Sequence, residues 1–472
     1  MTHHAVAVCG LTVRDRVGRT LARDVSFEIA RGEALALIGE TGSGKSLVAQ
    51  ALMGVLPPGL SAEGTVGVHG HPPVPLAEPA ALRALWSHET MLLPQEPGAA
   101  LDPTMRLARQ LANAETPASR VGAALAAVDL EPGVARAYPF ALSGGMAQRA
   151  LVACALLSNA PLVIADEPTK GLDEARIDLA ITLLRGLIER GRALLVITHD
   201  LAVARKLCGR VMVLHDGVVV EQGPARDVLQ APSHPYTRAW LAADPATWPA
   251  CRPCLARDDL VLAAHGLSFA WPRGPTLFRD LDLHLPRGTV LALAGPSGCG
   301  KTTLGNVLIG LLRPDEGEVS WAGADPYRDP RARRRLRRKY QKLHQDPGSA
   351  FVPYRTIGRQ LADLREVVPG LDLDATLPPL LDRLRLRTEL LARHPTEVSG
   401  GEAQRLALAR LLLLDPDVIL ADEPTSRLDP IVQRETILLL RELVEERRMA
   451  LLLVSHDHAL VKAVADEVLT LG

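Results

Sequence analysis

The chain has 472 residues, 47% hydrophobic and 23% charged, which is the balance of a globular protein long enough for at least two domains. Its formal net charge of −1 excludes the strong positive field of a typical nucleic-acid binder, so no nucleic-acid partner is expected. Six scattered cysteines are too few for a disulfide scaffold and indicate a reducing compartment.

Nothing in the sequence predicts insertion into a membrane. The N-terminus lacks the basic stretch and apolar core of a signal peptide. The longest apolar runs, such as 193–198 and 450–454, have the length of buried strands, whereas a spanning helix needs about 20 residues. Any role at a membrane would therefore require separate membrane-embedded partners.

In the first half, a predicted strand at 34–38 leads into residues 39–46, which have the spacing GxxxxGK[ST] of a phosphate-binding loop. Gly39, Gly42 and Gly44 let the backbone curl so that successive N–H groups point at phosphate oxygens. The positive end of the following helix dipole adds to this attraction. Lys45 is expected to contact the β- and γ-phosphates of a nucleotide, and the Ser46 hydroxyl to ligate Mg²⁺.

Further along, residues 94–157 are mainly helical in pattern and predict a helical subdomain. The next predicted strand, 162–165, is followed by Asp166 and Glu167. An aspartate there can hold the hydration shell of Mg²⁺, and the glutamate can activate or orient an attacking water. Two carboxylates at a strand end can also simply cap a helix, but a phosphate loop upstream favours the catalytic interpretation.

The second half repeats these features at a nearly constant offset. The distance from Lys45 to Lys301, from Ser143 to Ser399 and from Asp166 to Asp422 is 256 residues, and from His199 to His456 it is 257. A duplication follows, with domain 1 at 1–241, a linker at 242–260 and domain 2 at 261–472. Each domain alternates strands with helices, which predicts an α/β fold with a mostly parallel sheet. Strands are predicted at 34–38, 162–165 and 194–197, and at 290–294, 418–421 and 451–454.

The sequence LSGGMAQR around Ser143, Gly144 and Gly145 decides the resemblance. Such a helix start offers backbone N–H groups to a second anion. With the other motifs, it makes the chain resemble the ATP-binding-cassette (ABC) family over nearly its whole length. The resemblance implies two P-loop NTPase (RecA-like) nucleotide-binding domains. Each would have a parallel-sheet core, an antiparallel β subdomain and a helical subdomain carrying the signature.

In that family, ATP lies between the phosphate loop of one domain and the signature of the other. The resemblance therefore implies ATP and Mg²⁺ as cofactors and two hydrolytic sites. The first site would comprise Gly39, Gly42, Gly44, Lys45, Ser46, Gln95, Asp166, Glu167 and His199, with Ser399, Gly400 and Gly401. The second would comprise Gly295, Gly298, Gly300, Lys301, Thr302, Gln345, Asp422, Glu423 and His456, with Ser143, Gly144 and Gly145.

Roles within these sites also follow from the resemblance. The expected catalytic residues are Glu167, Glu423, His199, His456, Gln95 and Gln345, and the expected Mg²⁺ ligands are Ser46, Gln95, Asp166, Thr302, Gln345 and Asp422. A histidine at a strand end is usually an ordinary hydrogen-bonded residue, so only the motif order assigns the two histidines to the γ-phosphate. Trp271 stands where the family often stacks adenine, whereas the first half has Asp15 there.

The segment His234-Pro-Tyr-Thr-Arg238 resembles the C-terminal signature of dipeptide, oligopeptide and nickel importer ATPases, although an ordinary turn would also fit. The second half has a shorter C-terminus and no match to this tail. The resemblance implies the motor of an importer for peptides, nickel or metal chelates. It would work peripherally at the cytoplasmic face of the inner (plasma) membrane. Its partners would be two integral-membrane permease subunits and, indirectly, an extracytoplasmic substrate-binding protein.

Two alternatives from other functional classes remain open. A soluble tandem-cassette ATPase acting on ribosomes or nucleic acid tends to carry a long charged linker or zinc-binding inserts, and neither is found between 242 and 260. Gln95 and Gln345 match the family's loop that couples the nucleotide to a transmembrane partner. These separate coupling glutamines and the His-Pro-Tyr-Thr tail disfavour the motor of an exporter.

Overall fold

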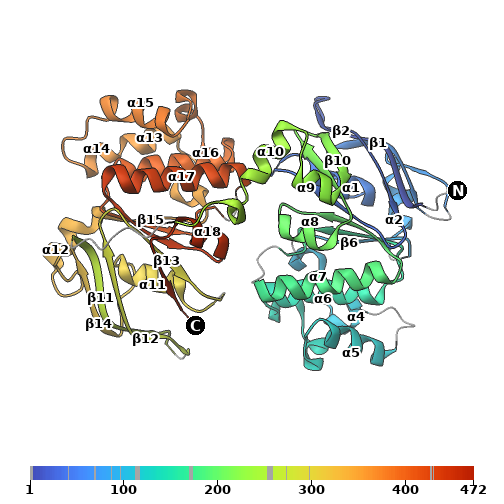
Figure 1. The fold of residues 1–472 in the computed structure, drawn as a ribbon, viewed down its shortest axis with the longest axis horizontal. Helices are drawn as coiled ribbons and strands as arrows, with labels where there is room; N and C mark the ends of the chain where they lie inside the picture. Colours follow the sequence, from blue (N-terminus) through green and yellow to red (C-terminus); the bar gives the residue numbers. More distant parts are fainter. Residues whose placement is uncertain are drawn as a thin grey trace. The chain divides into compact units, whose positions relative to one another are not determined.

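The computed structural model describes residues 4–40, 42–68, 71–86, 88–95, 97–111, 117–169, 174–251, 259–272, 274–296, 298–425, 428 and 430–471 (Figure 1). The chain divides into two compact units, Met1–Ala242 and Ala243–Gly472. Each unit is described by itself.

The main sheet of the first unit has, within the described residues, the strand order β10-β9-β3-β8-β7-β6. All neighbours pair in parallel except β10, which is antiparallel to β9. Every residue of β3, β7 and β8 is buried, as expected for parallel strands covered on both faces. The strands are β3 (Ala34–Ile38), β6 (Thr90–Leu93), β7 (Leu162–Asp166), β8 (Ala193–Ile197), β9 (Arg210–His215) and β10 (Val218–Pro224).

A second, antiparallel sheet of this unit has the order β2-β1-β4-β5. Its strands are β1 (His4–Arg14), β2 (Thr20–Ala30), β4 (Ser61–Val68) and β5 (Val74–Pro75). The helices of the unit are α1 (Lys45–Met53), α2 (Pro79–Ala84), α3 (Pro97–Ala100), α4 (Leu107–Leu111), α5 (Ala118–Ala127), α6 (Gly144–Leu157), α7 (Glu174–Glu189), α8 (Leu201–Leu207), α9 (Ala225–Gln230) and α10 (Pro235–Ala242). The described part of 94–157 is thus mainly helical.

The second unit repeats this plan, with a parallel sheet in the order β15-β16-β17-β13-β18 and an antiparallel sheet in the order β12-β11-β14. Its strands are β11 (Leu260–Ala270), β12 (Thr276–Pro286), β13 (Val290–Ala294), β14 (Glu316–Trp321), β15 (Tyr340–Leu343), β16 (Val418–Asp422), β17 (Ala450–Val454) and β18 (Glu467–Thr470). Its helices are α11 (Lys301–Leu308), α12 (Pro330–Leu336), α13 (Ile357–Ala362), α14 (Leu364–Val367), α15 (Leu373–Arg383), α16 (Gly400–Leu412), α17 (Pro430–Arg447) and α18 (His458–Val464).

The predicted α/β fold is confirmed in both halves, and each predicted strand coincides with an observed one to within a residue at either end. Within the second unit, helices α13 to α16 gather at the end opposite the antiparallel sheet (Figure 1). This is the arrangement of a parallel-sheet core with an antiparallel β subdomain and a helical subdomain.

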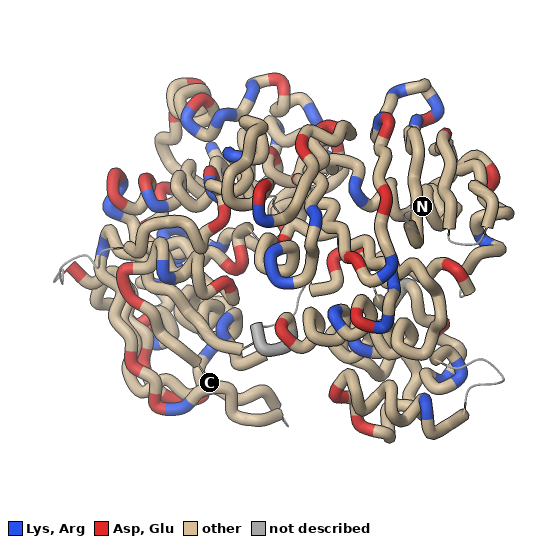
Figure 2. Tube along the Cα trace, turned by 45° about the vertical axis from the view of Figure 1, so that its right-hand side comes forward, with Lys and Arg blue, Asp and Glu red and all other residues tan. Residues whose placement is uncertain are grey.

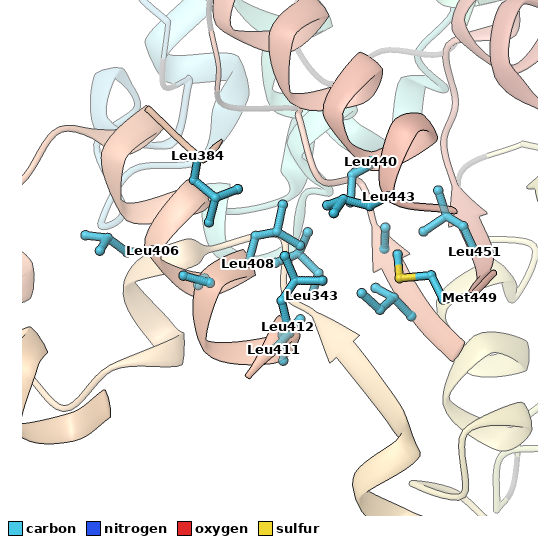
Figure 3. Packing of buried hydrophobic residues seen from close by; sticks show 14 of the residues in the cluster. Leu343, Leu384, Leu406, Leu408, Leu411, Leu412, Leu440, Leu443, Met449 and Leu451 are labelled. Atoms are coloured by element: carbon cyan, nitrogen blue, oxygen red, sulfur yellow. The ribbon is translucent and has the colours of Figure 1, made fainter. Parts of the chain in front are cut away.

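The helical subdomain is joined to the sheet through one hydrophobic cluster (Figure 3). Leucines of α16 and α17 pack there with residues of β15 and β17: Leu343, Leu406, Leu408, Leu411, Leu412, Leu440, Leu443 and Leu451. Burial of each such side chain contributes about 1.5–3 kcal/mol. This packing holds α16, and therefore the signature at its N-terminus, firmly within its unit.

Part of the expected linker is folded onto the second unit. The short 3₁₀ helix Pro245–Thr247 contacts α18, and Trp248 packs against the cluster described above. The backbone N–H of Cys251 donates to the carbonyl of Lys462 at 3.1 Å. Residues 252–258 of the linker lie outside the described residues.

Charges of both signs are interspersed along the described chain (Figure 2), in keeping with the net charge of −1. Among the described helices, none combines the length and the apolar character needed to cross a bilayer.

Candidate functional site

In each unit a buried strand, β3 or β13, is followed by Gly39 or Gly295 and then by a helix that begins at the phosphate-loop lysine, Lys45 or Lys301. Gly39 and Gly295 have φ values of 150° and 138°. A Cβ on Gly39 would lie 2.1 Å from the carbonyl oxygen of Leu214, and one on Gly295 would lie 2.2 Å from that of Leu471. Only glycine allows the backbone at these two positions to pass so close to the neighbouring carbonyl.

The lysine ammonium groups lie against the beginning of their own loops. Lys45 Nζ donates to the carbonyls of Gly39 at 2.8 Å and Glu40 at 2.6 Å. Lys301 Nζ donates to the carbonyls of Gly295 and Pro296, both at 2.7 Å. Each lysine is buried and lies at the N-terminus of a helix, whose dipole adds to the positive potential of the ammonium group.

The carboxylates at the strand ends lie beside these loops. Asp166 and Asp422 are the buried last residues of β7 and β16. In the second unit the Thr302 hydroxyl donates to Asp422 Oδ1 at 2.9 Å. In the first unit α1, which contains Ser46, packs against β7. In the second unit a hydroxyl and a carboxylate oxygen therefore lie together, and these are the hard donors that Mg²⁺ prefers.

The next residue in each half, Glu167 or Glu423, has a positive φ of 51° or 46°. Left-handed backbone at a non-glycine residue carries strain and is concentrated at functional sites. The backbone N–H groups of these glutamates donate to the carbonyls of Ile197 at 2.8 Å and Val454 at 3.0 Å, which holds the turn.

Each glutamate side chain is paired with the predicted histidine. Glu167 Oε1 lies 2.8 Å from His199 Nδ1, and Glu423 Oε1 lies 3.0 Å from His456 Nδ1. The Gln345 amide donates to Glu423 Oε2 at 3.0 Å. Gln95 occupies the matching place in the first unit, two residues after the end of β6. Three sequence-predicted residues thus meet in the second unit, and two of them in the first.

Charge and hydrogen bonding shift the pKa values of the second pair, Glu423 and His456, in opposite directions. The hydrogen bond and charge of His456, together with Lys301, lower the pKa of Glu423 despite its partial burial. The same hydrogen bond and the charge of Glu423 raise the pKa of His456. Glu423 is therefore a carboxylate, able to accept a proton or orient a water.

Most of the sequence segments that form these two sites match a known protein family. The family model described as "ABC transporter" matches residues 22–170 and 278–426, which include the phosphate loop, the signature and the strand-end carboxylates of each half. The chain belongs to the ABC transporter family. It is an ATPase with two ATP-binding domains.

Two relatives match this ABC ATPase along nearly its whole length. "Peptidoglycan transport ATP-binding protein YejF" of Agrobacterium fabrum is 34% identical, with 95% of this chain and 86% of the relative covered. "Glutathione import ATP-binding protein GsiA" of Escherichia coli K12 is 32% identical, with 97% and 82% covered. The solved structure titled "RNase-L Inhibitor" shares the fold at 22% identity, with a TM-score of 0.64, 97% of this chain covered and 87% of that one.

The signature residues of this ABC ATPase open α6 and α16. Ser143 and Ser399 are the N-caps, and their hydroxyl oxygens accept from the backbone N–H groups of Met146 and Glu402, both at 3.3 Å. The glycines that follow each serine, Gly144, Gly145, Gly400 and Gly401, form the first turn of the helix. The expectation that each signature serves the nucleotide of the opposite half stays a prediction.

The aromatic position differs between the units as predicted from sequence. Trp271 directly follows β11, is 47% exposed, and meets Phe269 edge-on with ring centroids 5.2 Å apart. In the first unit, Asp15 Oδ1 accepts from the backbone N–H groups of Val17 and Arg19, so this side chain shapes a turn. Only the second unit presents an aromatic surface here.

Sequence reasoning missed a contact between the tail and the first phosphate loop. Tyr236, at the start of α10, accepts a hydrogen bond through its hydroxyl from the Glu40 backbone N–H at 3.0 Å. Its ring stacks on His215 with centroids 3.8 Å apart, and His215 Nδ1 lies 2.9 Å from Glu40 Oε1. Because 196 residues separate Glu40 from Tyr236, the local pattern gives no signal for this contact.

Tyr236→Phe should weaken ATP binding to the first loop about three- to tenfold, since it keeps the ring on His215 but leaves the Glu40 N–H without its acceptor. The measurement is the dissociation constant of a fluorescent ATP analogue in a Lys301→Ala background, which restricts binding to the first loop. Tyr354→Phe, at an 81% exposed tyrosine, is the control. An unchanged dissociation constant in Tyr236→Phe would contradict the role of the tail.

Proposed function

We propose that this ABC ATPase is the ATP-hydrolysing motor subunit of an importer for peptides or peptide-like compounds. It would act peripherally at the cytoplasmic face of the plasma membrane with two separate permease subunits and, indirectly, an extracytoplasmic binding protein. The observation that carries the proposal is the match, over more than nine-tenths of this chain, to ATP-binding proteins named for peptidoglycan transport and glutathione import. Both named cargos contain peptide linkages. Nickel and metal chelates are supported only by the tail resemblance.

Within each site, we assign ATP binding to the phosphate loop and its lysine. Ser46 and Asp166, or Thr302 and Asp422, would hold Mg²⁺ with the help of Gln95 or Gln345. The hydroxyl and carboxylate oxygens already in contact at Thr302 and Asp422 fit such an ion. Bound Mg²⁺ would neutralise charge on the phosphates.

The hydrolytic step falls to the glutamates. Glu167 or Glu423 would accept a proton from the attacking water, and His199 or His456 would hold the carboxylate in place. The hydrogen bond from Gln345 to Glu423 gives the coupling glutamine a direct contact with this group. Movement of that glutamine upon hydrolysis would pass the event on to a partner. Trp271 would stack on the adenine of the second site.

Affinity purification of the tagged, full-length chain from membranes tests the proposal. The expected result is co-purification of two integral-membrane proteins in equal amounts, and ATPase activity that rises when peptide cargo and its binding protein are added. Recovery with ribosomes and without membrane proteins would overturn the importer assignment and favour the soluble tandem-cassette alternative.

A further inference from the structure

A lysine outside all the recognised motifs contacts the carboxylate proposed for Mg²⁺ in the second unit. Lys342 of β15 places Nζ 2.8 Å from Asp422 Oδ2 and 3.1 Å from Asn306 Oδ1. The side chains of Lys342 and Asp422 are only 12% and 10% exposed. Since Thr302 donates to the other oxygen, Oδ1, both oxygens of Asp422 are engaged, one by a hydroxyl and one by a cation.

The first unit has no cation at this position. Lys342 pairs in register with Leu420 of β16, and Leu92 pairs with Ile164 of β7. Because Leu420 and Ile164 are 256 residues apart, the offset of the duplication, Leu92 is the counterpart of Lys342. Leu92 is partly buried and packs against the hydrophobic core of its unit. The two halves therefore share their motifs, but a leucine in the first half stands where the second half has a lysine.

The ammonium group of Lys342 should weaken the binding of a divalent cation at Asp422. An ammonium group 2.8 Å from Asp422 Oδ2 neutralises the carboxylate that attracts Mg²⁺ and repels the ion itself. Low exposure of both partners limits screening by solvent and salt. Breaking the contact in the absence of Mg²⁺ leaves a buried carboxylate that has lost its charge partner, so the lysine also contributes to stability.

We propose that Lys342 lowers the Mg²⁺ affinity of the second site. Lys342 is a positioning residue, because it acts through Asp422. The inference rests on the proposed function in one respect: Asp422 and Thr302 are taken as the Mg²⁺ ligands of the second unit.

The test uses the full-length chain with Lys45→Ala, which restricts nucleotide binding to the second loop. The dissociation constant of TNP-ATP is measured over a series of free Mg²⁺ concentrations, and the concentration at half effect is the readout. Lys342→Met keeps the length and apolar stem of the side chain without its charge. The expected result is a half-effect concentration about tenfold lower, as for removal of one charge a few ångströms from the ion.

A matched variant places the charge in the other half. Leu92→Lys, in a Lys301→Ala background that leaves only the first loop, should raise the Mg²⁺ concentration at half effect about tenfold. Lys339→Met, which removes a lysine that pairs with the exposed Asp415, should leave it unchanged. If Lys342→Met unfolds, Lys342→Gln replaces it, because the amide still donates to Asp422 but carries no charge.

The possible outcomes distinguish failure of the Lys342 inference from failure of the proposed function. Half-effect concentrations that stay the same in the Lys342 and Leu92 variants, with TNP-ATP still bound, would overturn the inference and leave the proposed function standing. Failure of either loop to bind TNP-ATP in the parent proteins would instead overturn the proposed function. A loss of thermal stability in Lys342→Met without a change in the Mg²⁺ readout would assign the lysine a structural role and also overturn the inference.

Discussion

Replacement of Glu167 and Glu423 together by glutamine should leave ATP binding intact and lower ATP hydrolysis at least a hundredfold. A glutamine side chain has nearly the same size and can still bond to the histidine, but its amide cannot accept a proton from water. Loss of a positioned general base typically costs about 10²–10⁴ in rate. The strained backbone at both glutamates and their contacts with His199 and His456 fix the direction in which each carboxylate points.

Phosphate release and the amount of ATP retained after gel filtration measure the two effects of this double variant. Retained ATP should increase, because bound nucleotide is no longer converted to ADP. Glu189→Gln with Glu435→Gln, at exposed positions on α7 and α17, is the matched control and should hydrolyse ATP normally. Normal hydrolysis in the Glu167 and Glu423 variant would show that the catalytic carboxylates lie elsewhere.

Much of the site geometry could be predicted because buried parallel strands can be recognised from short stretches of sequence. Runs such as 34–38 and 418–421 are short and apolar, and each is followed by a glycine or a charged residue. The carboxyl ends of parallel strands meet at one edge of the sheet, so residues after different strands are brought together there. That rule alone places Glu423 near His456, and the structure shows them 3.0 Å apart.

The contact of Lys342 with Asp422 could not be predicted from the local sequence. It lies in a four-residue strand, Tyr340–Leu343, whose middle two residues are half-buried. A lysine at such a position is typical of a solvated strand face. Its partner Asp422 is 80 residues away, and only the pairing of β15 with β16 brings the two side chains together. The duplicated motifs suggest two equivalent sites, whereas the strand position between the motifs holds Lys342 in one half and Leu92 in the other.

The tail and the linker illustrate the same limit. His-Pro-Tyr-Thr could be recognised as a resemblance, but its contact with the phosphate loop depends on how α10 folds back over the unit. Prolines and a tryptophan between 242 and 260 favour a linker on composition. Trp248 instead packs against the core of the second unit, because an aromatic side chain is stabilised wherever it buries apolar surface.

Lys45→Ala with Lys301→Ala should lower the affinity for ATP at least a hundredfold without unfolding the protein. Hydrogen bonds to charged groups contribute about 1.5–3 kcal/mol each, and each ammonium is expected to make at least one with the β- and γ-phosphates. Roughly 2.7 kcal/mol corresponds to a hundredfold change in the dissociation constant. In the structure each Nζ donates to two loop carbonyls, which are neutral acceptors. A bound phosphate would offer the same ammonium group an anionic acceptor.

The dissociation constant of TNP-ATP, with circular dichroism to check the fold, measures this second effect. Lys206→Ala with Lys462→Ala removes two exposed lysines from α8 and α18 and serves as the control of equal charge. The comparison is decisive because both double variants lose the same net charge and differ only in where the cations stood. Equal affinities in the two would mean that general electrostatic attraction, and not the cation at the beginning of each loop helix, binds the triphosphate.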